Sequence, residues 1–134
     1  MEYHHFVGQV QHRARLADFE DAVTAIRATM QTLGERLFGG EAGNLAAQLP
    51  KEIGHYLFEA NKSESFGFDE FIDRVSIREG VERPKAQFDA RVVMELVREA
   101  VSPSLITKVR AQLPAEYGAL FAPTGLGAKQ SPGM

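Results

Sequence analysis

Two pairs of residues in this chain have a spacing that suits metal coordination. Glu2 precedes His5 by three positions, and Glu52 precedes His55 by three. Residues three apart share one face of a helix, and paired Glu-x-x-His motifs build carboxylate-bridged di-metal sites in helical bundles. Such a site also needs a Glu from each of two further helices. The candidates for these are Glu20, Glu35 and Glu59.

The same residues also have a structural explanation. Glu52 recurs as Glu116, whose residue three positions on is Ala119 rather than a histidine. A carboxylate in the first turn of a helix interacts favourably with the helix dipole, with or without a metal. A metal site at His5, Glu52 and His55 stays open as a hypothesis beside the structural interpretation, which expects no cofactor. In that interpretation the histidines are surface residues: His4, His5, His12 and His55.

The composition excludes several other kinds of site. The chain has no Cys, which excludes disulfides, thiolate catalysis and Cys-ligated zinc. No Ser lies in a nucleophile-elbow context, and Gly39-Gly40 lacks the spacing of a phosphate-binding loop. Nucleic-acid binding remains an alternative because basic residues are dense in the second half, although acidic residues are interleaved with them and the net charge is -3. These basic residues are Arg74, Arg78, Arg83, Lys85, Arg91, Lys108 and Arg110.

An internal repeat indicates how the chain is built. Residues 47–50 (AQLP) recur as residues 111–114 at an offset of 64. The repeated residues are Gln48, Leu49, Pro50, Glu52 and Gly54, with Gln112, Leu113, Pro114, Glu116 and Gly118. Residues that occur in both copies are those that the fold needs twice, so we interpret them as structural. We expect each Gln amide to bond backbone groups freed at the proline break, and each Gly to be crossed closely by another helix.

The same offset aligns two apolar stripes with the spacing of a helix face. They are Ala22, Ile26, Met30, Leu33 and Leu37, and Ala86, Ala90, Met94, Val97 and Val101. Near the start of each copy the offset becomes 65, which a one-residue gap in a loop explains. No strand-like alternation persists. The sequence therefore predicts an all-α fold, a helical bundle of two tandem pseudo-symmetric repeats with about four helices each.

The predicted domain covers residues 1–121, with repeat one at 1–60, a linker at 61–68 and repeat two at 69–121. The predicted helices are Tyr3–Arg13, Phe19–Leu37, Glu41–Gln48 and Pro50–Glu59, then Asp69–Arg78, Pro84–Val101, Pro103–Gln112 and Pro114–Phe121. Asp18 and Ser102 are the expected N-caps of the second and seventh helices. Phe66 and Phe68 are expected to pin the linker. Residues 122–134 are predicted to be a flexible tail, with Leu126 and Lys129 as a docking segment if it has a role.

Several of these segments resemble a known bacterial family. Residues 33–37 (LGERL), 39–42 (GGEA) and 45–50 (LAAQLP) resemble the first copy of the domain of unknown function 2267, and residues 71–75, 78–81 and 111–117 resemble its second copy. The resemblance implies a soluble two-copy helical protein and carries over no catalytic or ligand residues. One departure is Ser104-Leu105, where a Gly-Glu pair is expected at the start of the seventh helix.

We expect a non-enzymatic helical module for protein interaction or self-association in the bacterial cytoplasm. Its partner would be another protein or a second copy of the chain. No apolar run approaches the ~18 residues of a membrane span, and the first residues do not read as a secretory signal. A metal-binding protein or metal-dependent enzyme and a nucleic-acid-binding protein are the two alternatives.

Overall fold

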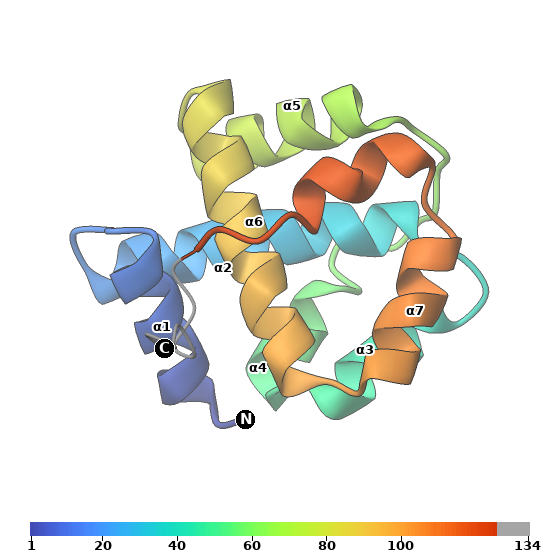
Figure 1. Cartoon of the computed structure of the whole chain (residues 1–134), viewed down its shortest axis with the longest axis horizontal. Helices are drawn as coiled ribbons and strands as arrows, with labels where there is room; N and C mark the ends of the chain where they lie inside the picture. The colour runs from blue at the N-terminus through green and yellow to red at the C-terminus, as the bar shows by residue number, and fades with distance from the viewer. Residues whose placement is uncertain (126–134) are drawn as a thin grey trace.

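The computed structural model describes residues 1–125, which fold into seven α-helices and one 3-10 helix with no strand in that range (Figure 1). The elements are α1 (Tyr3–Arg13), α2 (Phe19–Arg36), α3 (Glu41–Gln48), α4 (Lys51–Tyr56), α5 (Phe68–Glu79), α6 (Arg83–Ala100), α7 (Pro103–Ala111) and η1 (Ala115–Leu120). The predicted all-α class is confirmed. Leu126 and Lys129 lie outside the described residues.

Local sequence signals explain where these helices begin. The Asp18 side chain accepts a hydrogen bond from the Asp21 backbone N–H at 2.9 Å and caps α2, as predicted. Ser102 caps α7, and Pro103 is its first residue, so the departure at Ser104-Leu105 does not move the start of this helix. Pro50 and Pro114 directly precede α4 and η1. The prolines therefore separate elements as expected.

The last element of the second half differs from the α-helix expected there. Residues 115–120 form a 3-10 helix, whereas the corresponding part of the first half is α4. Six residues gain few i to i−4 hydrogen bonds, so tertiary contacts decide the helix type. Tyr117 supplies such a contact, because its hydroxyl donates a 2.8 Å hydrogen bond to the Phe66 carbonyl. Phe66 and Phe68 are themselves buried, which confirms that they pin the linker.

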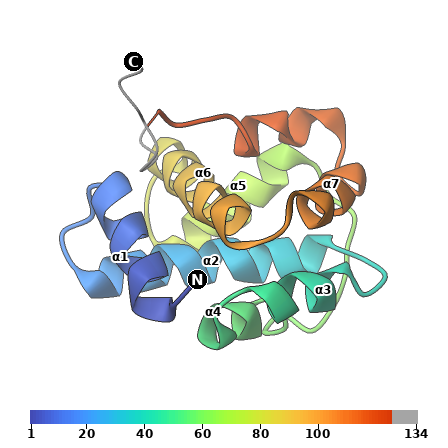
Figure 2. The same ribbon diagram turned by 60° about the horizontal axis from the view of Figure 1, so that its bottom comes forward.

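The two long helices form the centre of the molecule. In Figure 2, α2 runs through the middle, with α3 and α4 on one side and α5, α6 and η1 on the other. All ten residues of the two predicted apolar stripes are buried, with Ile26 at 1% and Met94 at 0% exposure. Burying a side chain of this size contributes about 1.5–3 kcal/mol. No helix among residues 1–125 is long and apolar enough to span a membrane.

A glycine sets the distance between α2 and α4. A Cβ at Gly34 would lie 1.9 Å from the Leu57 carbonyl oxygen, which is far inside any real contact. Only glycine therefore lets the chain just after α4 lie directly on α2. This close approach fixes the position of α4 and of the hollow beside it.

Candidate functional site

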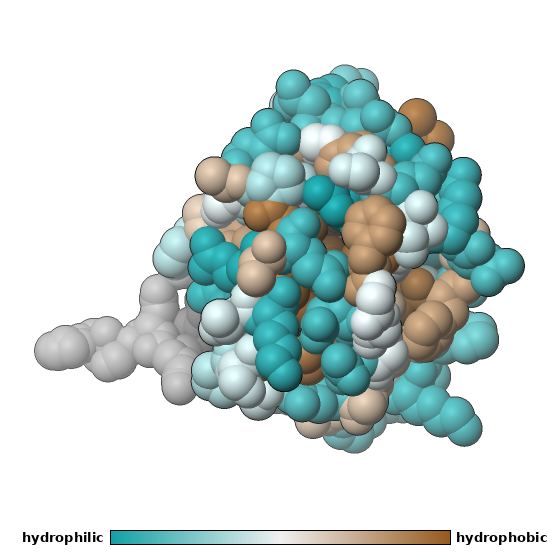
Figure 3. All heavy atoms as spheres, turned by 90° about the vertical axis from the view of Figure 1, so that its right-hand side faces the viewer, coloured by the Kyte–Doolittle hydropathy of each residue, from teal (hydrophilic) through white to brown (hydrophobic). Residues whose placement is uncertain are grey.

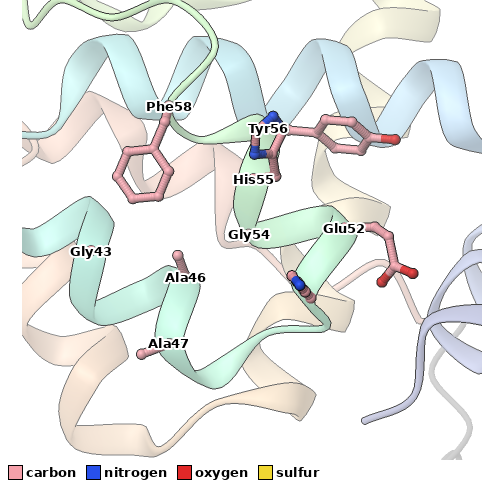
Figure 4. Close-up of a pocket in the computed structure, with 9 residues that line it drawn as sticks. Gly43, Ala46, Ala47, Glu52, Gly54, His55, Tyr56 and Phe58 are labelled. Carbon is pink, nitrogen blue, oxygen red and sulfur yellow. The ribbon is translucent and has the colours of Figure 1, made fainter.

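A hollow of about 810 Å³ lies between α3 and α4 (Figure 4). Small residues of α3 line one side, and larger side chains of α4 and the turn after it line the other. The lining residues are Gly43, Ala46, Ala47, Lys51, Glu52, Gly54, His55, Tyr56 and Phe58. In Figure 4 the Phe58 ring extends toward the short side chains of α3.

The local sequence explains this hollow. Pro50 ends α3 and begins α4, so the two short helices meet at a tight corner. They are closest at Gly54, where a Cβ would lie 2.9 Å from the Ala46 carbonyl oxygen. Away from this contact, Gly43 and Ala47 have too little side chain to fill the space between the helices.

A second hollow of about 420 Å³ adjoins the first and shares Gly43 and Phe58 with it. Phe38, Gly40 and Lys62 are among its other lining residues. We call the two hollows together the α3 groove, because residues of this helix line both. Within residues 1–125 the exposed large apolar side chains are Met1, Phe38, Phe58 and Ile77, and two of these four line the groove. Figure 3 shows that this face of the molecule carries apolar (brown) side chains among hydrophilic (teal) ones.

The predicted metal candidates do not converge. Glu52 and His55 both lie on α4 and are exposed, but in Figure 4 their side chains point in different directions. His5 is exposed on α1, and the Glu2 carboxylate caps that helix by accepting hydrogen bonds from the His4 and His5 backbone N–H groups. Among residues 1–125 no group of three or more His, Cys, Asp or Glu residues has a geometry that could hold a metal ion.

The two repeated glutamines bind the opposite half of the chain. The Gln48 side chain accepts a 2.7 Å hydrogen bond from the Ser102 backbone N–H, just after α6. The Gln112 side chain accepts from the Phe38 N–H and donates to the Phe38 carbonyl, both at 2.9 Å, just after α2. We expected these amides to serve the proline breaks of their own half. Their partners are instead the backbone groups that the ends of the two long helices leave unpaired.

The other repeated residues divide into similar and dissimilar pairs. Leu49 and Leu113 are both buried. Glu116 accepts a 2.9 Å hydrogen bond from the Phe68 N–H at the start of α5, whereas Glu52 is exposed at the groove. Gly118 has no atom within 4 Å of its would-be Cβ among the described residues, and Gly54 packs on α3 of its own half. The prediction that another helix closely crosses both glycines is therefore wrong at Gly118.

An unexpected buried carboxylate lies at the interface between the two halves. Glu35 of α2 is 2% exposed and accepts hydrogen bonds from both terminal nitrogens of Arg78, at 2.7 and 2.9 Å, and from Arg74 at 3.1 Å. Burial alone would raise the pKa of Glu35, but the hydrogen bonds and charges of Arg78 and Arg74 outweigh it and hold the pKa below its ordinary value. Glu35, a candidate for the metal hypothesis, is thus occupied by two arginines.

A second cluster of this kind joins α1 to α6. The Arg13 side chain is 1% exposed and donates to both carboxylate oxygens of Glu99, at 2.8 and 3.0 Å, and to Glu95 at 3.2 Å. Glu95 also accepts a 2.9 Å hydrogen bond from the Thr124 hydroxyl, so part of the predicted tail is bound to α6. The hydrogen bonds that Arg13 donates to Glu99 contribute most to raising the pKa of Arg13.

A signal for these clusters is present in the sequence. Arg13 and Arg78 are 65 residues apart, and Glu35 and Glu99 are 64 apart, which are the two offsets of the repeat. Aligning the charged residues as well as the apolar ones would have found them. Most basic residues of the second half are likewise occupied, because Arg83 pairs with Asp73, Lys85 pairs with Asp89, and Arg91 binds the Pro123 carbonyl.

Comparison with known proteins identifies the family. The family model described as "Uncharacterized conserved protein (DUF2267)" matches residues 3–120, which run from the first residue of α1 to the last residue of η1. A search of curated proteins finds no match. Because the family model covers most of the chain, the protein belongs to the DUF2267 family.

Proposed function

We propose that the chain is a non-catalytic helical module that self-associates through the α3 groove. The observation that carries this proposal is that one surface patch holds both parts of a self-complementary contact. Phe38 and Phe58 are 42% and 51% exposed, and the hollow beside them is lined by Gly43, Ala46 and Ala47. In a twofold dimer the same patch of each copy meets the other, so a ring of one copy would enter the hollow of its partner.

The size of the exposed rings supports this choice of occupant. Burying a Phe side chain fully contributes about 1.5–3 kcal/mol. A twofold contact contains each of these rings once from each copy, so each contribution counts twice. Four partly exposed rings meeting small-residue hollows would therefore give a contact with an aromatic core, the composition typical of interface centres. The groove carries charges of both signs: Lys51 and Glu52 line the first hollow, and Lys62 lines the second. An antiparallel pairing of two α3 helices would place Glu52 near Lys62 of the partner copy.

The second half of the chain has different residues at the positions that line the groove. At the offset of 64, Ala46 corresponds to Arg110 and Phe58 to Ala122. The Arg110 guanidinium lies 4.7 Å from the centroid of the Phe121 ring, whose counterpart in the first half is the buried Leu57. In the first half the small Ala46 leaves the space uncovered and Phe58 stands exposed beside it. This contrast favours the first half as the surface that meets a partner.

Sedimentation velocity of the full chain over a range of concentrations tests the proposal. We expect the wild-type chain to form a dimer as its concentration rises, and Phe58→Ala to shift this transition to a higher concentration. Ile77→Ala is the matched control, because Ile77 is 80% exposed and lies outside the groove. Circular dichroism would verify that each variant is folded. A wild-type chain that stays monomeric at every concentration, or an equal effect of both variants, would refute self-association through this groove.

We also infer that the two halves are copies of one unit related by a pseudo-twofold axis. The contacts between them support this inference, because they occur in corresponding pairs. Gln48 binds Ser102 and Gln112 binds Phe38, and Phe38 and Ser102 are themselves 64 residues apart. The salt bridges Arg78–Glu35 and Arg13–Glu99 correspond in the same way. Superposition of the backbones of residues 3–56 and 68–120 is the direct test, and unrelated helix orientations would refute it.

A further inference from the structure

The corner where α5 turns into α6 contains a pair of carboxyl groups, the half-buried Glu79 and the buried Asp89, that the proposed function does not use. Glu79 is the last residue of α5, and Asp89 lies in the second turn of α6 with 0% exposure (Figure 1). The two side chains are close enough to interact, and among the described residues neither Glu79 Oε1 nor Asp89 Oδ2, both buried atoms, has a hydrogen-bond partner. Two carboxylates both lack a donor, so a hydrogen bond between them requires one of them to keep its proton.

The charges around the pair do not compensate two carboxylates. The Lys85 ammonium lies 3.2 Å from Asp89 Oδ2, and its hydrogen bond to Oδ1 is long, at 3.4 Å. Lys85 is thus one positive charge facing two acidic groups. Asp21 of α2 adds a third acidic group on the opposite wall of the corner. Burial and the adjacent Asp89 raise the pKa of Glu79 to about 9, against the opposing effect of Lys85.

The corner also has space into which one carboxylate can move. A hollow of about 310 Å³ lies beside Glu79, with Asp21, Thr24 and Lys85 on its walls. Arg15, in the turn between α1 and α2, also lines it. Glu79 stands at the C-terminal end of α5, where the helix dipole disfavours a negative charge. Once ionised, Glu79 would therefore be repelled by both the helix end and Asp89, and the hollow would let it turn toward Arg15 and water.

We propose that Glu79 and Asp89 form a proton-dependent latch, which holds the α5–α6 corner closed while the pair shares a proton and opens the corner when the proton is lost. The folded state binds the Glu79 proton more tightly than the unfolded state does, and this sets how the stability of the fold depends on pH. Unfolding exposes Glu79 to water, where it ionises near 4.5. The latch therefore stabilises the fold most at acidic pH, and its contribution is lost as the pH rises from about 4.5 to about 9. The latch is controlled by binding of a proton, so alkaline pH, which removes this proton, would open the corner.

A carboxyl titration by carbon-13 NMR tests the latch directly in the wild-type chain. We expect the Glu79 carboxyl signal to stay that of the protonated form at pH 7 and to titrate near pH 9. Asp89→Asn removes the adjacent negative charge, so the Glu79 titration should move to lower pH. Ionisation of both Glu79 and Asp89 below pH 6 in the wild-type chain would overturn the proposal, whatever the variants do.

Two functional readouts use Glu79→Gln, whose amide imitates the protonated carboxyl. Its melting temperature should exceed that of the wild type at pH 9, and the difference should shrink toward pH 5. Trypsin cleavage after Arg78 and Lys85, which flank the corner, should accelerate between pH 7.5 and 9.5 in the wild type and stay slow in the variant. Glu82→Gln, an exposed residue of the same corner, is the control and should follow the wild type. Equal pH dependence in Glu79→Gln and the wild type would overturn the latch.

Discussion

Replacing Glu35 by Gln tests whether the buried salt bridges hold the two halves together. The substitution keeps the size of the side chain but removes its negative charge and replaces one acceptor oxygen with an NH2 group. This NH2 group would face the guanidinium groups, and two donors cannot form a hydrogen bond with each other. Breaking a buried ion pair costs about 3–5 kcal/mol. Because the side chains of Arg74 and Arg78 are 21% and 28% exposed and can regain water, we expect the lower end, about 3 kcal/mol. For a chain of this size that lowers the melting temperature by about 10 °C.

The effect of Glu35→Gln should depend on pH in a defined direction. Arg78 and Arg74 hold the pKa of Glu35 below its ordinary value of 4.5, despite burial. A depressed pKa contributes stability above pH 4.5 that is lost as the pH falls through the lower folded-state value. The difference between wild type and variant should therefore be full at pH 7 and should shrink as the pH falls below 4.5. The Glu79–Asp89 pair is present in both proteins, so its own pH dependence cancels in this comparison.

Thermal unfolding followed by circular dichroism measures this difference. Glu64→Gln is a suitable control, because Glu64 also binds Arg74, at 2.8 Å, but its side chain is 40% exposed. We expect little change from the control. The reasoning would be refuted by a Glu35→Gln melting temperature within ~2 °C of the wild type at pH 7, since about 3 kcal/mol cannot be hidden in so small a shift. A difference that does not shrink at acidic pH would show that packing, not charge, explains the loss.

Two further pairs of variants test the backbone contacts by urea denaturation. Gly34→Ala should destabilise the fold by about 2 kcal/mol, because its Cβ would meet a backbone carbonyl at 1.9 Å and overpacking outweighs the gain in helix propensity. Gly118→Ala, with open space among the described residues, is its control and should be nearly neutral, and equal effects would contradict the difference in packing. Gln112→Ala should cost about 2 kcal/mol for two hydrogen bonds, and Gln48→Ala about half as much for one. A larger loss at Gln48 would contradict this assignment of partners.

The sequence predicted the helices well because apolar periodicity and capping act locally. The stripes that include Ile26 and Met94 are buried, and Asp18 and Ser102 cap the helices they were expected to cap. The hydrogen-bond partners of side chains across the bundle were less predictable. A glutamine amide can both donate to and accept from any backbone group within reach, so its residue type does not determine its partner. The Gln112 amide could have bonded its own proline break, and only the packed structure places it on Phe38.

The chain just after α4 and the chain just after η1 pack differently on the two long helices because of one unduplicated residue. Position 34 is Gly and position 98 is Arg, and these are 64 residues apart. In the first half, the bare Gly34 backbone lets the Leu57 carbonyl lie directly on α2. In the second half, the Arg98 side chain donates a 2.8 Å hydrogen bond to the Phe121 carbonyl and so stands between α6 and the end of η1. A repeat in the sequence thus does not imply equal packing in the two halves.

The candidate groove follows from the same kind of divergence. The repeated glutamines Gln48 and Gln112 join the two halves. Ala46 and Phe58 have the counterparts Arg110 and Ala122, so the first half has a small residue and an exposed ring where the second half has an arginine and a small residue. Ala47 lines the same hollow and is exposed, so Ala47→Arg should place a guanidinium in the first-half groove without changing the contact of Ala46 with Gly54. If the groove is the dimer contact, Ala47→Arg must weaken dimerisation in sedimentation velocity while leaving the melting temperature of the monomer near that of the wild type.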